Sequence, residues 1–313
     1  ASHGGKGGNG QSQPGGTVIY GSITEPTTLG SGGGNCSISG GAGGGAVKLS
    51  AAGSIVLNGK ITANAKDGVA SGSWYLCGAG GGAGGSVWIS SNTISGSGII
   101  SANGGTASAL SGGGLAGQGG GGAGGRIAIY YKTSSSFGGQ KSVAFGYGRG
   151  STQNGQNGTV ETFGYPHEPI TLTQFRSDST TAIPTGGTIR EDNMVVKMQA
   201  DDASNPDTLF AQVEIQPIGT PFNNVPTHTG ENVAYSGTTV QLSATVDTLA
   251  DTVSYHWQAR VCDAGNPNLS LCSNWVSAGN NAETEADVKI SMNTNPNLPV
   301  IPQTSGYING LYT

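Results

Sequence analysis

Apolar and polar residues alternate in three short stretches of the first half of the chain, and each stretch directly follows a run of glycines. The alternating apolar pairs recur at a spacing of 40 residues: Val47 and Leu49, Val87 and Ile89, Ile127 and Ile129. Alternation with a period of two and an excess of β-branched residues predict β-strands. Repeats of about 20–50 residues are typical of stacked units that bury their apolar faces against one another. The pattern therefore predicts a stacked β-repeat.

A second apolar module follows each of these stretches. It reads ITANA from Ile61, ISANG from Ile100 and, in a degenerate form, VAFGYG from Val143. We expect these three copies to stack as well, because a single short strand cannot bury its own apolar face.

The glycine runs before the strands permit two interpretations. Of the 58 glycines, 49 lie in residues 1–164, in clumps that carry an alanine at positions 42, 83 and 123. Such runs are commonly flexible linkers. The constant register before each strand instead favours ordered packing, as polyglycine-II-like extended helices or tight turns. Extended helices of this kind have no internal hydrogen bonds, so their main-chain groups must pair with adjacent segments.

The second half of the chain has an ordinary alternating pattern. Six stretches are predicted as strands, at residues 170–175, 193–200, 209–215, 238–246, 253–261 and 286–292. Short strands separated by Pro, Gly, Asn and Asp clusters, without helical periodicity, predict a two-sheet sandwich. The expected fold is all-β, with a glycine-rich β-repeat domain at 1–165, a β-sandwich at 166–292 and an extended tail at 293–313.

Two resemblances support this division. The run from Gly119 to Tyr131, GGGGAGGRIAIYY, resembles glycine-rich repeats of large secreted bacterial surface proteins, over residues 1–164. The string YHWQARVCD at 255–263, with SNW at 273–275, is similar to the end of a fibronectin type III domain, over about residues 168–291. The first resemblance implies an extracellular surface role, and the second implies an immunoglobulin-like sandwich.

The four cysteines allow three pairings. The division into two halves favours the disulfides Cys36–Cys77 and Cys262–Cys272, and four unpaired buried thiols are the alternative. Two disulfides in a chain of low charge indicate an oxidising, extracellular environment. The chain begins at Ala1 without a signal peptide, which fits a mature secreted protein or a trimmed one.

Composition and charge exclude several classes of protein. No run of 18 apolar residues spans a membrane, and the net charge of −5 argues against a dedicated nucleic-acid binder. Residues 1–165 carry eight basic and three acidic residues (+5), whereas residues 166–313 carry five and fifteen (−10). Opposite charges on the two halves steer copies of the chain head to tail, and head-to-tail contacts that do not close produce filaments.

Candidate contact residues follow from this idea. The glycine-rich half has few large residues to cover an aromatic ring, so Trp88, Tyr130 and Tyr131 are predicted at a subunit interface, with packing on an adjacent repeat as the alternative. Ile308 and Leu311 lie in the tail, which is expected either to add a strand to a neighbour or to link a further domain.

Metal binding and catalysis receive little support. Asp201, Asp202 and Asp207 form a weak calcium site candidate without the spacing of a Ca²⁺ loop, and a solvated turn is the simpler interpretation. No nucleophile, base or paired carboxylates stand out, and we expect no cofactor and no enzymatic activity.

The sequence thus predicts a secreted structural protein that polymerises with copies of itself into a surface filament, exchanging a terminal segment. One alternative is an adhesin that binds a surface glycan or a receptor, and another is an accessory module of a larger secreted enzyme.

Overall fold

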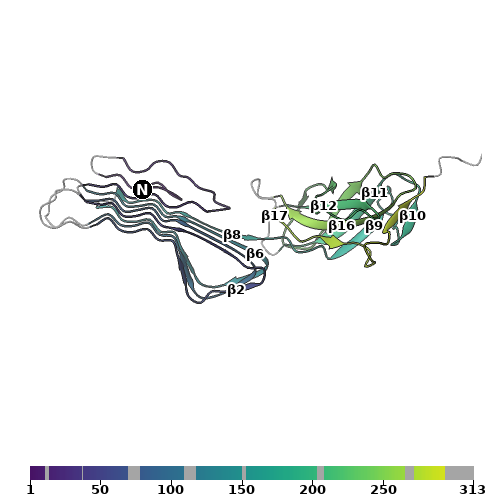
Figure 1. The fold of residues 1–313 in the computed structure, drawn as a ribbon, viewed down its shortest axis with the longest axis horizontal. Coiled ribbons are helices and arrows are strands. Elements are labelled where there is room, and N and C mark those ends of the chain that lie inside the picture. Colours follow the sequence, from purple (N-terminus) through teal and green to yellow (C-terminus); the bar gives the residue numbers. More distant parts are fainter. Residues whose placement is uncertain are drawn as a thin grey trace, which may run out of the picture. The chain divides into compact units, whose positions relative to one another are not determined.

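The computed structural model describes residues 1–10, 14–36, 38–69, 78–108, 118–149, 153–202, 208–264 and 271–292. Within this part the protein is all-β, and its contacts divide it into two compact units (Figure 1). The first unit comprises Ala1–His167 with Asp202–Pro206 and Asp263–Ser273, and the second comprises Glu168–Asp201, Asp207–Cys262 and Asn274–Thr313.

The strands are short in the first unit and longer in the second. The first unit contains β1 (Ala46–Ser50), β2 (Ser54–Val56), β3 (Lys60–Thr62), β4 (Ser86–Gly96), β5 (Ile99–Ser101), β6 (Arg126–Phe137), β7 (Gln140–Ser142) and β8 (Thr159–Gly164). The later strands are β9 (Thr171–Phe175), β10 (Gly187–Ile189), β11 (Met194–Ala200), β12 (Thr208–Pro217), β13 (His228–Thr229), β14 (Val233–Ala234), β15 (Val240–Val246), β16 (Ser254–Asp263), β17 (Leu271–Cys272), β18 (Val276–Ser277) and β19 (Val288–Ile290).

The first set of apolar stretches forms a parallel sheet with the strand order β1-β4-β6-β8. Val47 pairs with Val87, and Val87 pairs with Ile127, so the 40-residue spacing of the sequence is the register of this sheet. Val87 and Ile127 are fully buried in the core of the unit. Burial of such side chains stabilises the stack by about 1.5–3 kcal/mol each.

The second set of modules forms a parallel sheet with the order β3-β5-β7. Ile61 pairs with Ile100 as predicted, but Ile100 pairs with Lys141, so the predicted alignment with Val143 is wrong by two residues. A β-bulge contributes to this shift, because the offset between β4 and β6 changes from 40 residues before the bulge to 41 after it. The sequence spacing alone did not reveal the bulge.

The glycine tracts pack as a solid, and their hydrogen bonds follow a three-residue rule. In the tract at residues 80–85, every main-chain N–H donates to another segment, and residues three apart donate to the same segment. The three acceptor pairs are Gly34 and Ser31 for Gly80 and Ala83, Gly120 and Ala123 for Gly81 and Gly84, and Lys66 and Ala63 for Gly82 and Gly85. A period of three residues per turn without internal hydrogen bonds is the geometry of extended polyproline-II-type helices.

Three layers of chain result (Figure 1). The central layer holds four tracts, at 40–45, 80–85, 120–125 and 153–158, which lead into β1, β4, β6 and β8. The return layer holds the segments at 60–69, 99–108 and 140–149, and the N-terminal layer holds residues 1–10 and 14–36. Both outer layers donate hydrogen bonds to the central one, as Gly105 N–H does to Gly82 O and Gly33 N–H does to Gly41 O.

The four central tracts are equivalent position by position, as the register of their strands and the close approach of their backbones establish. Gly45, Gly85, Gly125 and Gly158 form one equivalent set. In this numbering Ala83 and Ala123 are equivalent but Ala42 is not, because it lies one position earlier and is equivalent to Gly82. The alanines therefore do not share one register, contrary to the sequence-based expectation.

The second unit contains two sheets over a common core. One sheet has the order β10-β19-β16-β12-β13, joined by β14, β17 and β18, and the other has the order β15-β11-β9. Each of the six predicted stretches contains one of its strands. Trp257 is buried in the core, as predicted, and its Nε1–H donates to Gln174 Oε1 at 2.9 Å.

Candidate functional site

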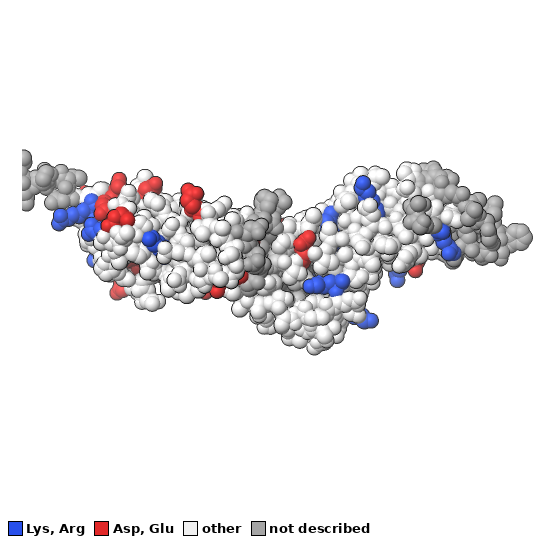
Figure 2. All heavy atoms as spheres, turned by 180° about the vertical axis from the view of Figure 1, so that it is seen from behind, with Lys and Arg blue, Asp and Glu red and all other residues white. Residues whose placement is uncertain are grey.

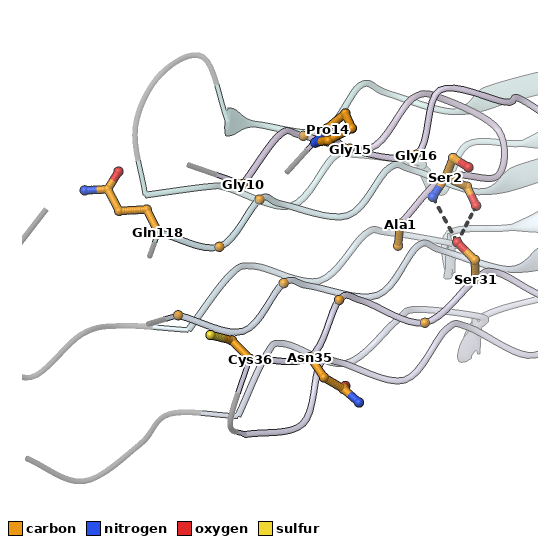
Figure 3. Close-up of a pocket in the computed structure, with 17 residues that line it drawn as sticks. Ala1, Ser2, Gly10, Pro14, Gly15, Gly16, Ser31, Asn35, Cys36 and Gln118 are labelled. Atoms are coloured by element: carbon orange, nitrogen blue, oxygen red, sulfur yellow. Dashed lines mark hydrogen bonds between the residues drawn. The ribbon is translucent and has the colours of Figure 1, made fainter. Parts of the chain in front are cut away.

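A pocket of about 540 Å³ lies in the first unit, at the surface of the N-terminal layer. Residues 1–16 provide one wall, residues 31–36 provide the other, and the ends of two central tracts, at 78–80 and 118–120, form the floor. Most of the lining is glycine, so the pocket exposes main-chain groups and few side chains. Figure 3 shows Ser2 and Ser31 joined across one end of this pocket.

The hydrogen-bond rule of the bundle explains why the pocket exists. Over the second tract, the N–H groups of Gly80 and Ala83 donate to Gly34 and Ser31 in the N-terminal layer. Over the third tract, Ala123 N–H donates to Ala1 O, but Gly120, which is equivalent to Gly80, has no acceptor in the described part of the chain. The N-terminal layer is therefore interrupted above Gly120.

The carbonyl groups beneath the layer show the same interruption. Gly33 and Gly30 donate to the carbonyls of Gly41 and Gly44, and Gly8 and Gly4 donate to those of Gly121 and Gly124. The equivalent carbonyls of the second tract belong to Gly81 and Gly84. Gly84 O receives a side chain, His3 Nδ1, at 2.7 Å, and among the described residues Gly81 O receives no donor.

His3 takes the place of main chain at this point. Its Nδ1–H donates to Gly84 O, and its Nε2 accepts from Thr28 Oγ1 at 2.7 Å. Burial lowers the pKa of His3, which favours the neutral imidazole that this pair of bonds requires. His3 thus attaches the N-terminal segment beside the pocket, and nothing in the sequence pattern pointed to this role.

Two further contacts fix the pocket walls. Ser31 Oγ accepts from Ser2 N–H at 2.9 Å and donates to Ser2 O at 2.8 Å, which ties one wall to the other. Cys36, in the second wall, is disulfide-bonded. Its predicted partner Cys77 lies outside the described residues, whereas Cys262 and Cys272 form the predicted disulfide.

The two lateral edges of the central layer carry side chains where interior tracts carry glycine. A Cβ on Gly82 or Gly122 would clash with the carbonyl oxygen of the preceding tract. Ala42, their equivalent, has a Cβ at this position because no tract precedes it, and Ala42 is exposed. Its methyl group therefore blocks the addition of a further tract in the same register.

Asn154 and Asn157 occupy the opposite edge. Their equivalents Gly121 and Gly124 face the return segment of their own repeat, and the fourth tract has no such segment. Instead, Asn154 Oδ1 accepts from Gly148 N–H at 2.9 Å, and Asn157 Oδ1 accepts from Phe145 N–H at 3.1 Å. In earlier repeats the equivalent N–H groups donate to the next return segment, as Gly104 does to Ala144 O. The two amides thus replace a missing repeat.

The aromatic residues predicted at a subunit interface mostly pack within the chain. Tyr130 and Tyr131 are only 2% and 8% exposed, so their assignment to an interface is wrong. The Tyr130 hydroxyl donates to Thr24 O at 2.8 Å, and its ring stacks on Phe163 with centroids 4.8 Å apart. The N-terminal layer covers these rings, which composition could not reveal.

Trp88 is half-buried, at an edge-on contact of 6.4 Å with the Tyr130 ring. Lys48 Nζ lies 3.7 Å from the centroid of the Trp88 ring, an arrangement that attracts a cation to the ring face. The packing on an adjacent repeat that was the alternative interpretation therefore accounts for this tryptophan. Ile308 and Leu311 lie outside the described residues.

The acidic residues do not assemble in the described part of the chain. Asp202 is buried, Asp201 is half-buried, and Asp207 lies outside the described residues. Among described side chains, no three His, Cys, Asp or Glu residues are placed to hold a metal ion. The calcium site therefore stays an untested prediction.

The comparisons with known proteins add no relative to this description. No protein-family model matches the chain, and neither a curated protein nor a solved structure matches it. No helix in the described residues is long and apolar enough to cross a membrane. The fold and the pocket together define an all-β protein whose glycine-rich unit exposes main-chain hydrogen-bonding groups in a cavity.

Proposed function

We propose that the protein is a non-enzymatic, extracellular binding protein of the adhesin type, in which the glycine-rich bundle presents a ligand pocket. One observation carries this proposal: the pocket above Gly120 is about 540 Å³ in volume, within the range of sites that hold small ligands or short segments. Disulfide-bonded cysteines support an oxidising location.

The rigidity of the bundle suits a presenting role. Its tracts are hydrogen-bonded to neighbours on several sides, so the pocket walls are held in place before a ligand arrives. Preorganised walls reduce the entropy that binding must overcome. In this proposal the first unit is a stacked repeat of the polyglycine-II type, and the second unit is a sandwich of the fibronectin type III kind that serves as a spacer.

Self-assembly into a filament is the second candidate. The unequal charge of the two halves favours it, and Figure 2 draws the basic and acidic side chains on one face of each unit. However, Ala42 at one edge of the bundle and Asn154 and Asn157 at the other oppose growth by continuing the glycine lattice. A filament would therefore use other surfaces, such as the tail that contains Ile308 and Leu311.

Light scattering and a binding assay separate the two candidates. We expect the full chain to be monomeric by light scattering and to bind cell surfaces or immobilised ligands. Replacing Gly34, which lines the pocket and would direct a side chain into open space, with leucine should abolish this binding. Regular filaments in electron micrographs, together with binding that Gly34→Leu leaves unchanged, would favour the filament.

A further inference from the structure

We propose that the pocket binds an extended, glycine-rich peptide segment that completes the interrupted N-terminal layer. This inference rests on the proposed function, because it specifies the ligand of the same pocket. It starts from the two main-chain groups that the layer leaves unsatisfied, the N–H of Gly120 and the carbonyl of Gly81.

The missing piece corresponds to one turn of an extended helix. Three residues farther along each tract, the equivalent groups are occupied, since Ala123 N–H donates to Ala1 O at 3.2 Å and Gly84 O accepts from His3. Three residues make one turn of a polyproline-II-type helix. A peptide in this conformation would present one carbonyl to Gly120 and one N–H to Gly81, as segment 30–34 does for its own neighbouring tracts.

The lining selects for small residues. Glycines form most of both walls and of the floor, and even a Cβ on Gly80 would lie only 3.2 Å from Gly34 N and 3.3 Å from Gly120 O. Interior tracts of the bundle reach hydrogen-bonding distance of one another because no side chain separates them. A ligand that approaches the same floor must likewise lack bulky side chains on its facing side.

A glycan fits these observations less well. None of the described residues that line the pocket is aromatic, and none carries a charged side chain, so a sugar ring finds no ring to stack on. The groups that await partners are one donor and one acceptor of the main chain, at positions that the bundle elsewhere fills with main chain. We therefore favour a peptide, such as a glycine- and alanine-rich segment of another extracellular protein.

The test uses the full chain and a synthetic peptide with blocked ends, Ala-Gly-Gly-Gly-Ala-Gly-Gly, which copies residues 79–85. We expect the peptide to shift the Gly120 amide resonance in NMR spectra and to slow exchange of this amide. A peptide with leucine in place of its central glycine should bind at least 10-fold more weakly.

Two matched variants locate the site. Gly34→Leu places a side chain in the pocket wall, and Gly45→Leu places the same side chain at the bundle edge, away from the pocket. Nothing lies within 4 Å of a Cβ at either glycine, and neither has a positive φ. Both variants should therefore fold, but only Gly34→Leu should weaken peptide binding, by at least 10-fold.

The outcomes distinguish the inference from the proposed function. If a glycan array shows binding that Gly34→Leu abolishes while the peptide leaves the Gly120 amide unchanged, the pocket is a ligand site and the peptide proposal is overturned. A Gly120 amide already protected without peptide would mean that a segment of the chain itself fills the layer, which also overturns it. If neither ligand responds to Gly34→Leu, both proposals fail.

Discussion

A Cβ on Gly85 would lie closer than 3.0 Å to the carbonyl oxygen of Gly45, whereas a Cβ on Gly45 would meet nothing within 4 Å. The two glycines are equivalent in the repeat and differ only in whether another tract lies beside them. Glycine is thus a packing requirement inside the bundle, where backbones touch, and not at its edge. The contrast gives a direct test of the packed interpretation of these tracts.

Gly85→Ala should lower the free energy of unfolding by about 3 kcal/mol, because the added methyl group forces backbone apart in a close-packed lattice. Gly45→Ala should change it by less than about 0.5 kcal/mol, as expected for an exposed site with space. Urea denaturation followed by circular dichroism measures both values. Equal effects of the two substitutions would show that the tracts are not packed as described.

Removing the amides at the far edge should loosen the last return segment. Asn157→Ala leaves Phe145 N–H without its acceptor, and Asn154→Ala does the same to Gly148 N–H. Each loss should cost about 1 kcal/mol and speed amide exchange at the residue concerned. Asn157→Asp keeps an acceptor oxygen and serves as the control. Unchanged exchange at Phe145 in Asn157→Ala would contradict the capping role.

Acid should weaken the attachment of the N-terminal segment at His3. Burial lowers the pKa of His3 in the folded protein, so the unfolded chain, with a histidine pKa of about 6.5, binds the proton more readily. Stability from this group is present above pH of about 6.5 and falls as the pH drops toward the lowered folded value. The melting temperature should therefore fall between pH 7 and pH 5, and His3→Gln should reduce this fall. An identical fall in His3→Gln would rule His3 out as the cause.

Asp287 should act in the opposite direction. Burial raises the pKa of this carboxyl group, although Trp257 N–H donates to its Oδ2 at 3.0 Å. Its Oδ1 is buried and has no hydrogen-bond partner among the described residues. Stability from the protonated form is present below the unfolded pKa of about 3.9 and is lost as the pH rises through the raised folded value.

Asp287→Asn imitates the protonated form and keeps an acceptor for Trp257 N–H. The variant should match the wild type in urea denaturation near pH 3.5 and exceed its stability at pH 7. Asp287→Ala, which removes the acceptor, should be less stable than Asp287→Asn at both pH values. A wild type that is more stable than Asp287→Asn at pH 7 would contradict the raised pKa.

The strands could be predicted from the sequence because their signal is local. Alternation places Val87 and Ile89 on one face, and the 40-residue spacing then fixes their neighbours in the sheet. The bulge between β4 and β6 could not be predicted, because it changes the register without changing the alternation. For this reason the third return strand is centred on Lys141 and not on Val143.

The pocket could not be predicted, because it depends on which segments lie above each tract. Nothing local shows that residues 1–36 form a third layer, that they cover Tyr130, or that they leave Gly120 without an acceptor. A signal for the edges did exist. Ala42 stands five residues before Val47, whereas Ala83 stands four before Val87, and the fourth tract carries Asn154 and Asn157 where the others have glycine.

The residues that terminate the bundle also define its width. Because Ala42 and the two asparagines belong only to the outermost tracts, the interior repeats are interchangeable units whose number is not limited by their own packing. Duplication of one such unit in the gene would broaden the body by a single row and leave both ends chemically unchanged. Evolution can thus enlarge this surface in steps of about 40 residues without inventing a new core.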